Sequence, residues 1–167
     1  MPSKTVTESG LDFILDADKL FLPEREVFYI TKLSSHGVKI CDVIFLNPHD
    51  DLLIIEIKSS SPREHQEFIK EIKQKFVDSL LIFVATWANR KNTQAKYFPS
   101  SLQISNVLQR KMRLVLIIAS HKPEWLSPLR DSLRKECRPL EKLFSLEETQ
   151  VYNQELARRK LKLTINE

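Results

Sequence analysis

The spacing of apolar side chains along the chain predicts alternating helices and strands. Residues 8–20 carry apolar side chains at helical spacing, and Pro23 would end that helix. Three stretches rich in β-branched and aromatic residues follow, each bounded by turn-forming residues. They predict three strands, at residues 27–33, 38–46 and 52–58.

A long helix should follow the third strand. Ser61, Pro62 and Glu64 fit an N-cap, a proline at the first helical position and a capping-box glutamate. The helix carries apolar residues at helical spacing, and Lys70, Lys73 and Lys75 are expected on its solvated face. Its far end, residues 80–87, is apolar all round, which fits either a buried helix end or a separate strand.

The second half of the chain predicts one more strand and one more helix. Residues 113–120 are almost uniformly apolar, which is typical of a central strand. Pro123 and Glu124 open a helix that should run to about Cys137. The expected fold is therefore α/β, with a mixed sheet flanked by helices, in the order helix, three-stranded meander, helix, strand, helix. We expect one domain over residues 1–167, with a basic C-terminal segment from about residue 150 whose structure stays open.

The strands at 38–46 and 52–58 are joined by a short turn, so they should pair antiparallel. If Leu46 faces Leu52, one face of the hairpin is entirely apolar and should lie on the core: Cys41 with Ile57, Val43 with Ile55, and Phe45 with Leu53. The other face becomes charged at the open end, where Asp42 opposes Glu56 and Ile40 opposes Lys58. A one-residue slip would scramble the apolar set, so the pattern supports this register.

The opposed carboxylates of Asp42 and Glu56 need a positive charge close to them. Side chains directly opposite each other have Cβ atoms about 4.5–5.5 Å apart, where like charges destabilise a sheet. A divalent ion between Asp42 and Glu56 would remove that repulsion, and carboxylate oxygens are ligands that Mg²⁺ accepts. Lys58 lies on the same face and could hold a nucleophilic water or stabilise charge on a phosphate. The expected helix N-terminus at residues 61–64 would also attract a phosphate.

Composition narrows the function classes. The 26 basic and 22 acidic residues leave a net charge of +4, which permits a nucleic-acid partner without requiring one. Only two glycines occur, so a glycine-rich phosphate loop is excluded. The two cysteines and four histidines make no zinc pattern. No signal peptide is visible and the longest apolar run, residues 80–88, is too short to span a bilayer, so we expect a cytoplasmic protein without a membrane partner.

The spacing of Asp42, thirteen intervening residues and then Glu56-Ile57-Lys58 resembles the PD-(D/E)xK nucleases, the restriction-endonuclease-like superfamily. The resemblance covers about two-thirds of the chain and implies a Mg²⁺- or Mn²⁺-dependent nuclease acting on nucleic acid, with DNA favoured. It assigns Asp42 and Glu56 to metal binding, Lys58 to the attacking water and the Ile57 carbonyl to a further metal ligand. Cys41 stands where the family pattern has a proline. Many members of this superfamily act as homodimers. Whether this chain forms a homodimer or belongs to a larger complex stays open at this point.

Other interpretations remain at this point. Asp42, Glu56 and Lys58 could form ion pairs at a solvated strand end, with Lys39 or Lys32 as the partner of Asp42. The family fold could also serve as an inactive nucleic-acid-binding or assembly module, or the pattern could be incidental in a protein-interaction domain. By resemblance, Glu8 and Gln66 are candidates for an additional acid and a helix glutamine.

A polar loop and a basic tail could add contacts to a substrate. In the loop at residues 89–101, basic and aromatic side chains could grip nucleic acid: Arg90, Lys91, Lys96, Tyr97 and Phe98. A plain connecting loop is the favoured interpretation. The basic stretch at residues 157–163 fits either a phosphate contact or an oligomer contact.

Overall fold

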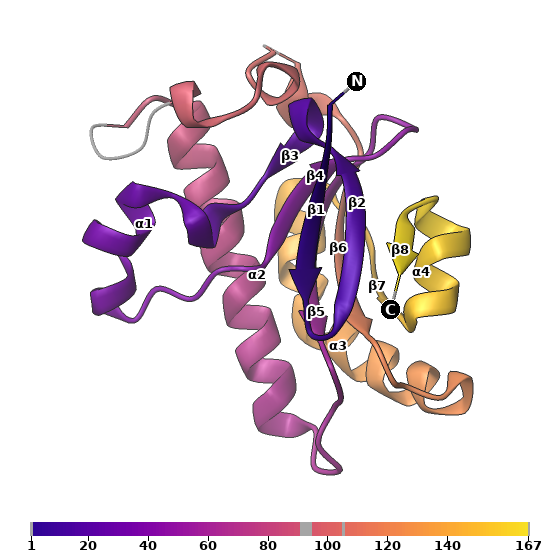
Figure 1. The fold of residues 1–167 in the computed structure, drawn as a ribbon. Coiled ribbons are helices and arrows are strands. Elements are labelled where there is room, and N and C mark those ends of the chain that lie inside the picture. Colours follow the sequence, from indigo (N-terminus) through magenta and orange to yellow (C-terminus); the bar gives the residue numbers. More distant parts are fainter. Residues whose placement is uncertain (1, 91–94, 105, 167) are drawn as a thin grey trace.

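The structure, a computed structural model, describes residues 2–90, 95–104 and 106–166 (Figure 1). In this part of the chain it is an α/β protein with a mixed five-stranded sheet, a small antiparallel sheet and four α-helices. The larger sheet has the order β3 (Leu20–Phe21), β4 (Val43–Leu46), β5 (Leu52–Lys58), β6 (Met112–Ile118) and β7 (Glu147–Tyr152). The smaller sheet consists of β1 (Ser3–Glu8), β2 (Leu11–Asp16) and β8 (Thr164–Asn166). The helices are α1 (Val27–Lys32), α2 (Gln66–Trp87), α3 (Pro123–Phe144) and α4 (Gln154–Leu161).

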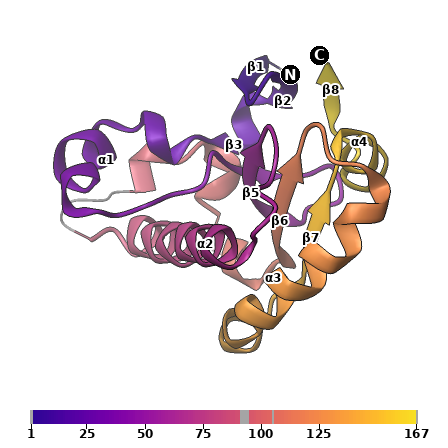
Figure 2. The same ribbon diagram turned by 90° about the horizontal axis from the view of Figure 1, so that it is seen from below.

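The larger sheet lies between two layers (Figure 2). Helices α2 and α3 cover one face, and the small sheet with α4 covers the other. Each interface holds its own apolar core, so both faces of β4 and β5 are buried. On the α2 side lie Ile44, Leu46, Leu52 and Ile54, and on the opposite side lie Val43, Phe45, Leu53, Ile55 and Ile57.

Several predicted elements are confirmed. β5 has the predicted bounds, and β6 lies between β5 and β7 and runs parallel to both. The apolar stretch at residues 80–87 is the end of α2 rather than a strand, and α3 begins at Pro123. The β4–β5 pairing has the derived register, with Val43 opposite Ile55 and Leu46 opposite Leu52.

The predicted first helix is wrong, because residues 3–16 form the β1–β2 hairpin. Ser9 and Gly10 both have positive φ, 52° and 81°, which is the geometry of a tight two-residue hairpin turn. Val6, Leu11, Phe13 and Leu15 are buried and follow the alternation of strands. The apolar pair Phe13 and Ile14 suggested a helix, yet Ile14 points outward and is exposed.

The predicted strand at residues 27–33 is also wrong, since this stretch contains α1. The first strand of the meander is instead β3, which pairs antiparallel with β4. Packing outweighed the β propensity of the stretch. Phe28 is buried and its ring lies 5.3 Å from that of Tyr97, while the Tyr29 hydroxyl donates to the Val38 carbonyl.

Strand β4 is shorter than predicted, because the residues before Asp42 bond to α2 instead of β5. The amide of Lys39 donates to Asp78 Oδ2 and that of Cys41 to Ser79 Oγ, both at 2.8 Å. Cys41 therefore packs in the core on the α2 side, and its predicted place on the face of Val43 is wrong.

The predicted capping box is wrong as well. Helix α2 begins at Gln66, and its N-cap His65 makes no side-chain capping bond. The Ser61 hydroxyl lies 3.5 Å from His121 Nε2 instead, and the backbone at Ser59 still bonds to the segment after β6. The strand geometry thus continues past Lys58 and delays the helix.

The C-terminal segment is folded into both sheets. β7 pairs with β6, and β8 pairs with β2. Between them, Asn153 Oδ1 accepts a hydrogen bond from the Leu156 amide and caps α4. The basic residues at 157–163 therefore lie on and after a helix that packs beside the small sheet.

Candidate active site

Strand β5 directs Glu56 and Lys58 toward α2. Because side chains alternate along a strand, Ile55 and Ile57 enter the core beside the small sheet and Glu56 and Lys58 face the other way. Glu56 is fully buried, with 0% exposure, and the side chain of Lys58 is 28% exposed. An interior carboxylate therefore lies beside a lysine that reaches solvent.

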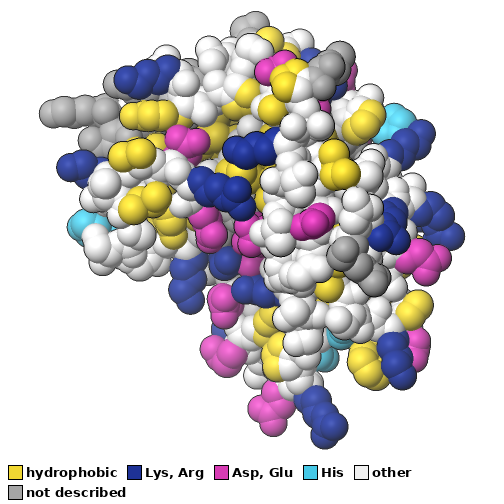
Figure 3. Space-filling view, in the orientation of Figure 1, with side chains coloured by type: hydrophobic (Ala, Val, Ile, Leu, Met, Phe, Trp, Pro, Cys, Tyr) yellow, Lys and Arg dark blue, Asp and Glu magenta, His cyan; other side chains and the backbone are white. Residues whose placement is uncertain are grey.

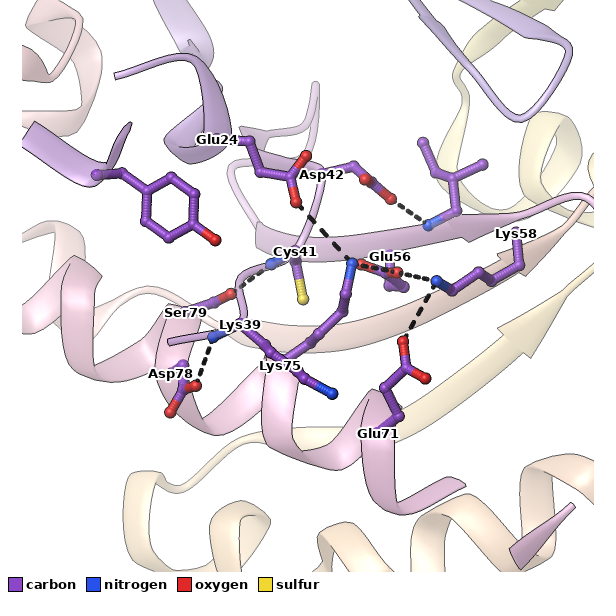
Figure 4. Close-up of polar contacts among 12 residues, drawn as sticks. Glu24, Lys39, Cys41, Asp42, Glu56, Lys58, Glu71, Lys75, Asp78 and Ser79 are labelled. Atoms are coloured by element: carbon purple, nitrogen blue, oxygen red, sulfur yellow. Dashed lines mark hydrogen bonds and ion pairs between the residues drawn. The ribbon is translucent and has the colours of Figure 1, made fainter. Parts of the chain in front are cut away.

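Asp42 is held at the open end of the hairpin (Figure 4). Its Oδ2 accepts a 2.7 Å hydrogen bond from the Ile57 amide, in the place where a longer β4 would supply a backbone carbonyl. The bonds from Cys41 to Ser79 and from Lys39 to Asp78 anchor the preceding residues to α2. The structure thus brings Asp42 next to the Glu56-Ile57-Lys58 segment.

Two ammonium groups meet the same oxygen of Glu56. Oε1 lies 2.7 Å from Lys75 Nζ and 3.1 Å from Lys58 Nζ. Among the described residues, Oε2 has no hydrogen-bond partner. Lys58 Nζ also lies 3.7 Å from Glu71 Oε1, so ion pairs connect α2 and β5 across the site (Figure 4).

Lys75 was not recognised from the sequence as a residue of this site, and its predicted place on a solvated helix face is wrong. Its side chain is only 14% exposed. A signal was available, because Lys75 follows Ile72 by three residues and precedes Ser79 by four, and both of these are buried. A lysine within the buried stripe of a helix needs an acidic partner, and Glu56 is that partner.

Glu24 is the second residue that sequence patterns did not reveal. It lies in a short 3-10 turn at Pro23–Arg25, and its Oε1 is 4.0 Å from Lys75 Nζ. The neighbouring Arg25 Nη2 donates to Glu8 Oε1 at 3.1 Å. No repeated spacing links this turn to β5, so only the folded chain brings Glu24 to the site.

The electrostatics of the site reflect burial and crowding of carboxylates. Burial, together with the charge of Asp42, raises the pKa of Glu56 from 4.5 to about 7 against the lowering effect of Lys75 and Lys58. Burial also raises the pKa of Glu24, with Asp42 and Glu8 adding to the effect and Lys75 opposing it. Burial disfavours charged Lys75, but the carboxylates of Glu56, Asp42 and Glu24 together outweigh burial and raise the pKa of Lys75.

The donors at this site fit a hard divalent cation. Asp42 and Glu56 supply carboxylates. The Ile57 carbonyl accepts a hydrogen bond from Ser9 Oγ at 3.2 Å, and it belongs to the same residue of β5 as the amide bound by Asp42. The buried, unpartnered Oε2 of Glu56 is an acceptor that such a cation would satisfy. Over the described residues, no cluster of three or more His, Cys, Asp or Glu is positioned for a metal.

The remaining predicted residues lie in different places. Glu8 is at the end of β1, paired with Arg25, and its charge acts on Glu24. Gln66 lines a surface groove of about 550 Å³ between α2 and α3, with Ser132 and Lys135, apart from the Glu56 cluster. The role of either residue stays a prediction.

The loop before β6 contributes aromatic residues to packing. Phe98 is buried, with its ring 4.8 Å from Phe21 and 4.9 Å from Phe83, which disagrees with a base-stacking role. Tyr97 packs against Phe28. Lys91 lies outside the described residues.

Charges of both signs share the surface around the site. On the face seen in Figure 3, acidic and basic side chains gather in the hollow between the α1 region and the β1–β2 hairpin. Lysines and arginines alternate with aspartates and glutamates on this face rather than forming a continuous basic area.

Comparisons with known proteins find no match for this chain. The chain matches no protein-family model, and no curated protein or solved structure is significantly similar to it. Within the described residues, no helix combines the length and apolar content needed to span a membrane.

Proposed function

We propose that this protein is a metal-dependent nuclease of the PD-(D/E)xK type, which hydrolyses phosphodiester bonds in DNA. One observation carries the proposal. Asp42 is hydrogen-bonded to the backbone of Ile57, and the neighbouring residues Glu56 and Lys58 share one face of β5. This is the relation that the resemblance requires between its two acidic residues and its lysine.

The sheet supports the same proposal. β3, β4 and β5 form an antiparallel meander, α2 follows, and β6 adds parallel to β5. That is the order of the restriction-endonuclease-like core after its first helix. The first helix of that core has no counterpart here, because the β1–β2 hairpin takes the N-terminal position.

In this mechanism, Asp42, Glu56 and the Ile57 carbonyl would hold Mg²⁺ or Mn²⁺. When bound, the metal polarises the scissile phosphate and lowers the pKa of the attacking water. Lys58 donates hydrogen bonds to that water or to a phosphate oxygen, since its ammonium reaches solvent. Glu71, whose Oε1 lies 3.7 Å from Lys58 Nζ, orients the ammonium.

The proposal is tested by cleavage of plasmid DNA, single-stranded DNA and RNA with Mg²⁺, with Mn²⁺ and with EDTA. We expect cleavage of DNA only when a divalent metal is present. Cleavage that EDTA leaves undiminished would contradict the assigned chemistry. Intact substrates under every metal condition would contradict nuclease activity.

A second candidate is a nucleic-acid-binding or assembly module without catalysis. The observation in its favour is that Lys75 and Lys58 already neutralise Glu56 without a metal. DNA binding that weakens with salt, in a protein that cuts nothing in any divalent metal, would select this function.

A further inference from the structure

Lys75 binds the carboxylate that a metal would need. Its ammonium lies 2.7 Å from Glu56 Oε1, closer than the 3.1 Å of Lys58. It also lies within the electrostatic reach of Asp42 and 4.0 Å from Glu24 Oε1. The ammonium of Lys75 thus already interacts with both carboxylates that the proposed metal site uses.

A lysine and a divalent ion cannot share this carboxylate without cost. Two positive charges a few ångströms apart in a buried site repel each other by several kcal/mol, even at an effective dielectric constant of about 20. The side chain of Lys75 is only 14% exposed, so its ammonium is largely shielded from bulk water. Glu24, whose side chain is 43% exposed and whose Oε1 lies 4.0 Å from Lys75 Nζ, offers the ammonium a second partner (Figure 4).

We propose that the Lys75 ammonium competes with a divalent ion for Glu56, so that an ion enters the site only when Lys75 turns toward Glu24. This inference rests on the metal site of the proposed function and adds a regulation of metal binding to that site. Lys75 keeps the carboxylates paired while no metal is bound, and it sets how much metal the site requires.

Metal affinity tests the competition directly. Mn²⁺ binding is measured by calorimetry at about pH 8, where ordinary carboxyl groups are ionised. We expect Lys75→Met to bind Mn²⁺ at least about tenfold more tightly than the wild type, because one buried positive charge is gone. Lys73→Met is the matched control on the same helix, since Lys73 pairs with Glu136 on α3 and should leave the affinity unchanged.

The outcomes separate this inference from the function on which it rests. Equal Mn²⁺ affinity in Lys75→Met and wild type, abolished in both by Asp42→Asn, would overturn the competition and leave the metal site intact. An absence of Mn²⁺ binding in both proteins would remove the metal site itself, and with it the proposed function.

A measurement on the wild-type protein covers the case in which Lys75→Met does not fold. An acylating reagent is applied with and without saturating Mg²⁺, and modification of each lysine is followed by mass spectrometry. We expect Mg²⁺ to raise the modification rate of Lys75 severalfold relative to Lys73. A Lys75 rate that Mg²⁺ leaves unchanged or lowers would overturn the proposal.

Discussion

Replacing Lys58 with alanine should reduce DNA cleavage by about 100-fold or more, the usual effect of losing one group that stabilises a developing negative charge. Lys58 is the cation on this face of β5 that is open to solvent, at 28% exposure, while Lys75 is more buried and bound to Glu56. The loss should appear in kcat rather than in KM, because the ammonium acts on the reacting groups. Steady-state cleavage of a fluorescent DNA substrate measures both constants.

The matched control for this substitution is Lys70→Ala. Lys70 lies on the outer surface of α2 and pairs with Glu67, so its removal should leave cleavage unchanged. Thermal unfolding of both variants verifies that they are folded. Full activity in Lys58→Ala would reject the role of Lys58 even if the protein proves to be a nuclease.

The contribution of Glu56 to the stability of the metal-free protein should fall as the pH rises from about 4.5 to about 7. The pKa of Glu56 is about 7 in the folded chain and 4.5 ordinarily, so between these values the folded state holds a proton that the unfolded state has lost. Stability therefore decreases through this window, and ionised Glu56 costs the folded state about 3 kcal/mol above it. Lys75, whose pKa is raised, stays charged throughout the window and does not change the slope.

Urea unfolding in EDTA at several pH values, compared between wild type and Glu56→Gln, measures this contribution. The glutamine cannot titrate, so the variant should lose less stability than the wild type across the window. All other groups are the same in both proteins, so their contributions cancel in the difference. Parallel stability curves for the two proteins would show that Glu56 ionises normally in the fold.

The β4–β5 hairpin was predictable because two independent constraints agree on its register. The short turn limits the pairing, and apolar residues on alternate positions of both strands reject a one-residue slip. The same argument brought Asp42 beside Glu56. The predicted pairing failed before Val43, where Ser79 and Asp78 of α2 accept the backbone hydrogen bonds of Cys41 and Lys39 and no ladder with β5 forms.

The N-terminal hairpin was missed for a local reason. Ser9-Gly10 is a two-residue turn with positive φ at both positions. The Ser-Gly dipeptide was visible in the sequence as a turn signal. The side chains of Phe13 and Ile14 fit a helix as well as a strand, and helical spacing alone did not distinguish them.

The charged cluster around Glu56 depends on contacts that local patterns do not carry. Lys75 is 19 residues from Glu56, and Glu24 belongs to a turn between β3 and β4, the first two strands of the meander. Only the packing of α2 on the sheet places the Lys75 ammonium on Glu56 Oε1. A lysine inside a buried helical stripe is nevertheless a useful warning that an interior acid lies opposite.

The central claim is that Asp42 and Glu56 hold a catalytic divalent ion beside Lys58. Anomalous diffraction from crystals soaked in Mn²⁺ tests it most directly. We expect an anomalous peak in contact with Asp42, Glu56 and the Ile57 carbonyl, and no such peak in crystals of Asp42→Asn. Saturated crystals that show Mn²⁺ only elsewhere, with Lys75 still bound to Glu56, would contradict it.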